Sequence, residues 1–316
     1  MAGSERAPIR DETAWSAVDY PGRDDWARPL PAEVIAEIEG GAATLPATEA
    51  FMAAALAALE SGPGFILLTG WPVERHDREG NARALSRLGE GLGSLVDQTM
   101  RRNRIEDITD RGLPFDHTTR GYSGTAYLPF HTDGSDYTAL MCLGVAAEGG
   151  VSILASAATA HNTILAERPD LLEVLCRGFH HHRRGEEAEG EPPVTPERVP
   201  VFGTRRGLIQ CCYNRNPNEW LEREGIEVTE IETEALDYLD AVLERPDIQV
   251  RMAMCPGDIQ LINNYVTLHS RTAYRDGPGR KRHLLRVWIR SRAPRRAGPN
   301  IIDLYAPWES RRDLPR

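Results

Sequence analysis

The sequence predicts a mainly β protein with flanking helices, built on a double-stranded β-helix, the jelly-roll or cupin-like barrel. Two observations support this fold class. From Tyr137 onward the chain consists largely of short apolar segments separated by Gly and Pro, and many short strands that close on themselves are typical of this architecture. The helical patterns are few, two of them lie before this region, and no internal repeat is evident.

The length of 316 residues is compatible with one large β domain or two smaller ones. We expect a single domain over residues 1–316. In this division, residues 1–62 form a helical lead-in, residues 63–292 form the jelly-roll core with helical insertions, and residues 293–316 form a C-terminal tail.

Three amphipathic helices are expected. The first starts at Thr48 and ends at Gly62-Pro63-Gly64, and the second carries leucines at 85, 88 and 92. The third begins at Thr229, where Glu232 completes a capping box, and its acidic residues (Glu234, Asp237, Asp240 and Glu244) are expected to form a solvated face rather than a metal site.

The expected strands are short and rich in apolar residues. They are Phe65–Thr69, Tyr137–Ala146, Val151–Ala155, Val199–Phe202, Leu208–Tyr213, Ile248–Met254 and Ile259–Asn263. A helical insertion is expected near Thr163–Cys176, and the stretches Arg104–Gly124 and Arg183–Pro200 are expected to act as lids.

His131 and Asp133 are the first candidate functional residues. Side chains two apart on a strand point to the same face, so this imidazole and carboxylate could bind one metal ion together. A lone His-x-Asp is weak evidence, but His269 offers a third ligand. Two histidines and one carboxylate form the facial triad of non-haem Fe(II) oxygenases.

A strand with alternating arginines follows His269. Arg282, Arg286 and Arg290 are expected on one face of the segment 280–290, with apolar residues on the other. Arginines on a rigid strand are suited to binding a carboxylate. The alternative is an exposed edge strand that positive charge keeps soluble.

Taken together, these motifs resemble the taurine dioxygenase/clavaminate synthase-like (TauD/TfdA) group of Fe(II)- and 2-oxoglutarate-dependent oxygenases. The resemblance runs from about Gly64 to Arg292 and includes Gly149-Gly150-Val151-Ser152 and His269-Ser270-Arg271-Thr272. It implies that His131, Asp133 and His269 bind Fe(II), with 2-oxoglutarate as cosubstrate and O2 as oxidant.

The resemblance also implies a carboxylate clamp. Arg286 would bind the distal carboxylate of 2-oxoglutarate, and Ser152 stands where many relatives have a threonine that touches the same group. Arg282 lies on the same face, so the choice between the two arginines stays open, with Arg286 fitting the family's pattern better. Arg290 would hold a substrate carboxylate, and Tyr127 and Arg215 are further substrate-binding candidates.

The expected function follows from this resemblance. The enzyme would hydroxylate or desaturate a small carboxylated or amino-acid-like metabolite, in specialised metabolism, and release succinate and CO2. The competing hypotheses are a non-catalytic or Zn/Ni-binding cupin-like barrel and an interaction module built on the basic strand. The three consecutive histidines His180-His181-His182 are expected to have a surface or strand-edge role.

Composition limits the partners. The formal net charge is −10, from 37 basic and 47 acidic residues, which argues against binding nucleic acid or an anionic membrane. The five cysteines show no Cys-x-x-Cys spacing, which favours free thiols in a reducing cytoplasm. We expect a cytoplasmic protein that acts on a small molecule and has no membrane segment, and a homo-oligomer stays open.

Overall fold

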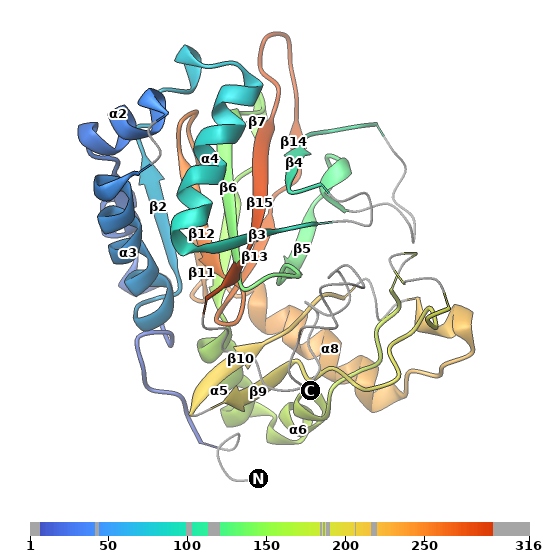
Figure 1. Ribbon diagram of the computed structural model, residues 1–316. Coiled ribbons are helices and arrows are strands. Elements are labelled where there is room, and N and C mark those ends of the chain that lie inside the picture. The colour runs from blue at the N-terminus through green and yellow to red at the C-terminus, as the bar shows by residue number, and fades with distance from the viewer. Residues whose placement is uncertain are drawn as a thin grey trace.

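Two β-sheets face each other in a jelly-roll arrangement, as the computed structural model shows (Figure 1). The structure describes residues 7–41, 44–98, 103–112, 121–183, 185, 187, 190–205, 207–215 and 220–292. The larger sheet has seven strands in the order β1-β2-β12-β6-β15-β3, with β4 also paired to β15. The smaller has the order β11-β8-β13-β5. Within the described residues the two sheets do not join into a closed barrel.

The bounds of the elements are as follows. The strands are β1 (Ala27–Pro29), β2 (Phe65–Thr69), β3 (Gly93–Val96), β4 (Ile105–Ile108), β5 (Leu128–His131), β6 (Tyr137–Gly144), β7 (Glu148–Gly149), β8 (Ser152–Ser156), β9 (Phe202–Arg205), β10 (Leu208–Cys211), β11 (Gln249–Met252), β12 (Ile259–Asn263), β13 (Thr267–Arg271), β14 (Tyr274–Arg275) and β15 (His283–Ser291). The α-helices are α1 (Arg23–Trp26), α2 (Ala32–Gly40), α3 (Pro46–Ser61), α4 (Arg78–Leu92), α5 (Ala157–Glu167), α6 (Pro169–Arg177) and α8 (Glu230–Leu243). Short 3-10 helices span Ala17–Asp19, Val73–Arg75, Gly121–Ser123 and Leu221–Glu224.

The fold buries three apolar layers. Helices α2, α3 and α4 cover the outer face of the larger sheet, and helices α5, α6 and α8 pack together beside the smaller one (Figure 1). A third layer lies between the sheets, where Phe65 and Ile262 of the larger sheet meet Leu154 and Val250 of the smaller. Every layer therefore depends on strands whose side chains alternate between faces.

Strand β15 illustrates this alternation. Its odd residues Leu285, Val287 and Ile289 belong to the layer beneath the helices. The even residues Arg286 and Trp288 point the other way, into the cavity between the sheets. Because β15 pairs with β6 on one side and with β3 and β4 on the other, it is interior. The alternative of an exposed basic edge strand is therefore wrong.

Several sequence predictions are confirmed. Strands β2 and β12 have the predicted bounds, and α8 begins at the predicted capping box, with the Thr229 hydroxyl accepting from the Glu232 backbone N–H. The five cysteines are free. In the described part of the chain, no helix combines the length and apolar character needed to cross a bilayer.

Other predictions need correction. The helical insertion is two helices, α5 and α6, because Pro169 starts a new helix at its first position. The strand expected at 199–202 is displaced to β9. The lead-in also contributes more than helices, since β1 pairs with β2 at the edge of the larger sheet. The tail 293–316 and parts of both expected lids lie outside the described residues.

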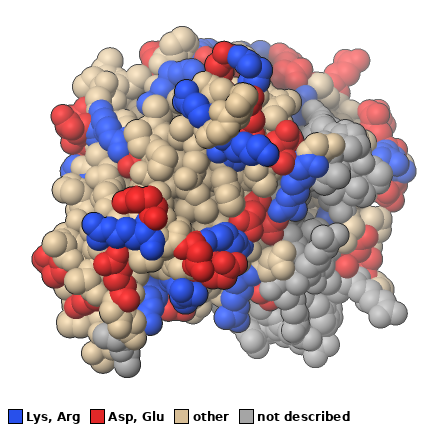
Figure 2. Space-filling model, turned by 90° about the horizontal axis from the view of Figure 1, so that it is seen from above, with Lys and Arg blue, Asp and Glu red and all other residues tan. Residues whose placement is uncertain are grey.

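The molecular surface mixes both signs of charge. On the face shown in Figure 2, Lys and Arg side chains alternate with Asp and Glu around a largely uncharged area. This face of the described residues therefore has no continuous basic stripe of the kind that follows a nucleic-acid backbone.

Candidate active site

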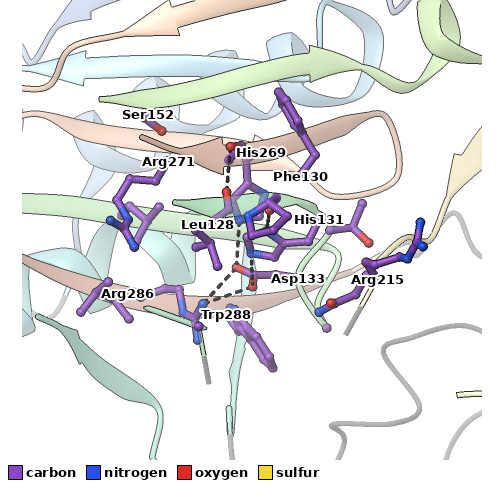
Figure 3. A pocket seen from close by; sticks show the side chains of 18 of the residues that line it. Leu128, Phe130, His131, Asp133, Ser152, Arg215, His269, Arg271, Arg286 and Trp288 are labelled. Carbon is purple, nitrogen blue, oxygen red and sulfur yellow. Dashed lines mark hydrogen bonds and ion pairs between the residues drawn. The ribbon is translucent and has the colours of Figure 1, made fainter. Parts of the chain in front are cut away.

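The three candidate metal ligands converge between the sheets (Figure 3). His131 ends β5 and pairs directly with His269 of β13, and their ring centroids lie 4.2 Å apart. The Asp133 Oδ1 atom is 3.9 Å from His131 Nε2, and its Oδ2 atom is 3.7 Å from His269 Nε2. All three ligand atoms lie within 4.8 Å of one another, although His269 is more than 130 residues from the pair.

Asp133 is not held in the way the sequence suggested. Strand β5 ends at His131, so Asp133 lies beyond it, and the argument from alternating strand residues is wrong for this carboxylate. Instead, the Asp133 backbone N–H donates to Asn264 Oδ1 at 3.0 Å. The Thr138 hydroxyl donates to Asp133 Oδ2 at 2.8 Å, and Asn264 Nδ2 donates to that hydroxyl oxygen at 3.0 Å. Asn264 thus orients both the backbone and the carboxylate.

The protonation states suit a divalent metal. Burial lowers the pKa of His131. Burial and the proximity of His131 lower the pKa of His269 to about 3. Both imidazoles are therefore neutral. The His131 Nδ1 atom lies 2.9 Å from the Pro129 carbonyl oxygen, to which it can donate, leaving Nε2 as the ligand. Burial alone would raise the pKa of Asp133, but the charge of Arg286 outweighs it and holds the pKa well below its usual range.

The donor set fits a ferrous ion. Metal binding requires neutral histidines and an ionised carboxylate, and two nitrogens with one oxygen, leaving open positions, are the facial-triad set. Ligands about 2.1 Å from a shared ion can be at most about 4.2 Å apart. The two histidine–carboxylate distances satisfy that limit.

Arg286 pairs with this carboxylate. Its Nη1 atom is 3.1 Å from Asp133 Oδ1, and both side chains are buried. Gln98 fixes the arginine from the other side: Arg286 Nε donates to Gln98 Oε1 at 2.7 Å, and Gln98 Nε2 donates to the Arg286 carbonyl at 2.8 Å. The metal end of the cavity is therefore charge-balanced within the protein.

A second pair of arginines, Arg271 and Arg282, lines the same cavity, whose volume is about 100 Å³. Both are buried, and among the described residues neither has a carboxylate within ion-pair distance. Within the described part of the chain, the hydrogen bonds of the Arg271 guanidinium go to the backbone carbonyls of Gly124, Thr125 and Thr272. Burial, and next the charge of Arg282, lowers the pKa of Arg271 to about 10.

Ser152 lies at this end of the cavity. It is the register partner of Arg271 across β8 and β13, and its hydroxyl is hydrogen-bonded to Gln260. In the view of Figure 3, Ser152 and Arg271 lie on one side of the triad and Arg215 on the other.

The three substrate-binding candidates, Arg215, Tyr127 and Arg290, lie in different places. Arg215 lines the cavity, but its guanidinium pairs with Asp237 at 2.7 Å and Asp240 at 3.1 Å on α8. Tyr127 is 40% exposed and its hydroxyl donates to Glu244. Neither Tyr127 nor Arg290 belongs to the cavity's described lining. Arg290 lies near the end of β15, where it pairs with Ser94 of β3.

The acidic residues of α8 are more than a solvated face, since they bind Arg215 and Tyr127 near the cavity.

The three consecutive histidines are separate from the site. His181 is buried, and burial lowers its pKa to about 4, while His182 lies 3.3 Å from Glu224.

Five contributing residues were not singled out from the sequence. They are Gln98, Thr138, Asn264, Arg271 and Tyr274. A signal existed for Arg271, which stands two positions after His269 and shares its face of β13. The contacts of Gln98 and Asn264 span long stretches of sequence, and no local pattern indicates them.

Comparison with known proteins identifies the family. The Taurine catabolism dioxygenase TauD, TfdA family matches residues 27–288, which is most of the chain. The chain belongs to this family. It is 38% identical over 239 residues to FR-33289 synthase of Streptomyces rubellomurinus, covering 73% of this chain and 70% of that protein.

Solved structures share the fold. An asparagine oxygenase in complex with Fe(II), 2S,3S-3-hydroxyasparagine and succinate has a TM-score of 0.61 at 19% identity, covering 84% of this chain and 93% of that chain. The non-haem iron oxygenase OrfP in complex with Fe and α-ketoglutaric acid has a TM-score of 0.60 at 17% identity, with the same coverage.

The protein is accordingly a non-haem Fe(II)- and 2-oxoglutarate-dependent dioxygenase that uses O2. Family membership decides against a non-catalytic barrel that uses the triad only for Zn²⁺ or Ni²⁺.

Proposed function

We propose that the enzyme oxidises a C–H bond of a small carboxylated or amino-acid-like metabolite by hydroxylation or desaturation, in specialised metabolism. The observation that carries this proposal is a cavity in which the triad and an arginine pair without carboxylate partners face one space. The similar proteins support the substrate class: the OrfP and asparagine oxygenase complexes contain hydroxylated amino acids, and the 38% identical relative is a Streptomyces synthase.

In this proposal His131, Asp133 and His269 hold the iron. When bound, iron and 2-oxoglutarate would activate O2, which is the oxidant of the reaction. The protein's own residues keep both imidazoles neutral, hold the carboxylate ionised and fix its direction through Thr138 and Asn264. Such preorganisation removes the cost of arranging ligands during turnover.

We assign the distal carboxylate of 2-oxoglutarate to Arg282 rather than Arg286. Arg286 touches the ligand Asp133 and therefore lies beside the metal, where the chelating keto acid end belongs. The five-carbon chain puts the distal carboxylate roughly 5 Å from that end. Arg282 lines the same cavity just before the start of β15, and among the described residues it has no carboxylate partner like that of Arg286.

Ser152 and Arg271 complete this carboxylate site. Both line the cavity with Arg282, and a hydroxyl beside guanidinium groups is suited to a carboxylate oxygen. On the other side of the triad, Arg215 and Asn214 are the polar groups nearest the space left for substrate. Tyr127 and Arg290 have no place in this assignment.

The test is turnover. Purified protein supplied with Fe²⁺, ascorbate and 2-oxoglutarate should release succinate, and a library of amino acids and small carboxylates should contain compounds that accelerate the release. Mass spectrometry then separates hydroxylation, a gain of one oxygen, from desaturation, a loss of two hydrogens. If iron-loaded, folded protein formed no succinate with any carboxylated compound, the proposed substrate class would be wrong.

A further inference from the structure

Tyr274 lies between the two arginines of the carboxylate site. The centre of its ring is 4.6 Å from the guanidinium carbon of Arg271 and 5.4 Å from that of Arg282. A ring face attracts a guanidinium and also allows it to stack flat. One ring thus stabilises two cations that repel each other.

The Tyr274 ring makes both guanidinium contacts. Tyr274 is 7% exposed, and its ring lies against both arginines. A variant without the ring loses both guanidinium contacts, whereas phenylalanine at this position retains the ring.

Gly150 provides the space for the stem of Arg282. A Cβ atom at Gly150 would lie 3.0 Å from Arg282 Cδ and 3.2 Å from its Nε, closer than ordinary van der Waals contact. Gly150 also has a φ of +73°, which disfavours any other residue. Strand pairing between Tyr274 and Gly149 brings this turn against the ring, so both features act on one arginine.

We infer that Tyr274 and Gly150 are positioning residues for 2-oxoglutarate: together they hold the Arg282 guanidinium beside Arg271, so that both face the distal carboxylate. This inference rests on the proposed role of Arg282. Neither residue touches the metal ligands, and both act through the arginine. A clamp that is already ordered before binding loses less conformational freedom when the carboxylate arrives.

The experiment measures binding without turnover. Isothermal titration calorimetry of Zn²⁺-loaded protein would use 2-oxoglutarate and glutarate, which has both carboxylates but no keto group. Tyr274→Leu and Gly150→Ala should each weaken both ligands roughly tenfold. The conservative variant Tyr274→Phe retains the ring and should restore affinity to within about twofold of wild-type.

Matched controls separate this effect from general damage. Tyr238→Leu removes another tyrosine ring that lies under a guanidinium, that of Arg168, far from the cavity along the chain. Gly41→Ala places a side chain at a φ of +67° with nothing within 4 Å, so it tests backbone strain alone. Both controls should bind 2-oxoglutarate as wild-type does, and the visible spectrum of Co²⁺-loaded protein should be the same for every variant.

The outcomes distinguish the inference from the proposed function. Wild-type affinity in both Tyr274→Leu and Gly150→Ala overturns the positioning role, as does a Tyr274→Phe variant as weak as Tyr274→Leu. If Arg282→Gln binds both ligands normally, the assignment of the carboxylate site itself fails. If Arg282→Gln weakens binding while the two positioning variants do not, only the inference about Tyr274 and Gly150 fails. If Tyr274→Leu does not fold, Gly150→Ala alone tests the inference.

Discussion

The two ends of the cavity treat buried charge in opposite ways. At the metal end, Arg286 and Asp133 neutralise each other and the histidines are neutral, so the protein satisfies the site by itself. At the carboxylate end, Arg271 and Arg282 meet only carbonyls and an aromatic ring among the described residues. A buried cation without a counter-ion costs stability.

This difference indicates which kind of ligand binds at each end of the cavity. The metal end needs a cation that shares an existing carboxylate, whereas the carboxylate end needs an anion to complete it. A dicarboxylate with a chelating end fits both requirements at once. The following predictions test this contrast, beginning with the largest effect.

Loss of a metal ligand should abolish catalysis. His269→Ala leaves two ligands for the ion, and because even outer partners of metal ligands cost about 10- to 100-fold in activity, we expect a loss of more than about 100-fold. Succinate formation and the metal content of the purified variant measure it. The matched control is His181→Ala, a buried histidine outside the site, which should retain activity if it folds. Substantial activity in His269→Ala would remove this residue from the ligand set.

Removing one arginine from each end should affect stability differently. In metal-free protein, Arg286→Met leaves the Asp133 carboxylate buried without its cation and should lower the free energy of unfolding by about 3 kcal/mol. Saturating Zn²⁺ should restore part of that loss, since the ion replaces the missing positive charge. Urea unfolding with and without metal is the measurement.

Arg282→Met is the matched variant. It removes a charge that has no carboxylate partner among the described residues, so unfolding free energy should stay within about 1 kcal/mol of wild-type or rise. If both variants lost equal stability, the contrast between the two ends would be wrong.

Sequence reasoning reached this site in part. Facing strands and helices follow from local patterns, which is why β2, β12 and α8 were predictable, and the alternation on β15 placed Arg286 on the inner face. Local patterns also pointed to the three side chains that the structure brings together as candidate metal ligands. They could not show how Asp133 is held, because Asn264 lies 131 positions away and supports a residue outside any strand.

The choice between the two arginines shows the same limit. Spacing and alternation treat Arg282 and Arg286 alike, since both occupy even positions facing the cavity. What separates them is the partner of each: Arg286 meets Asp133 and Gln98, while Arg282 meets Tyr274. The contacts of Arg286 join segments more than 150 positions apart and arise only when those segments pack together, so the sequence pattern could not separate the two arginines.

The KM for the cosubstrate 2-oxoglutarate tests the carboxylate end directly. Arg282→Gln removes a charge-assisted contact to the distal carboxylate, which should raise the KM for 2-oxoglutarate roughly 10- to 100-fold. Steady-state kinetics with varied 2-oxoglutarate provides the measurement, and Arg290→Gln on the same strand is the control, expected to match wild-type because it does not line the cavity. If Arg282→Gln left the KM for 2-oxoglutarate unchanged, Arg286 would be the arginine that binds the distal carboxylate.

The smallest effect is expected at Ser152, which contributes one neutral hydroxyl where Arg282 contributes a charge. Ser152→Ala should raise the KM for 2-oxoglutarate roughly threefold to tenfold and leave kcat almost unchanged, in line with one hydrogen bond. The Gln260 side chain loses a partner in this variant, so thermal unfolding must be compared as well. Ser152→Thr retains the hydroxyl and should restore the wild-type KM. A fall in kcat with KM unchanged would instead place Ser152 with the metal end, and the division of the cavity into two differently charged ends would then need a different boundary.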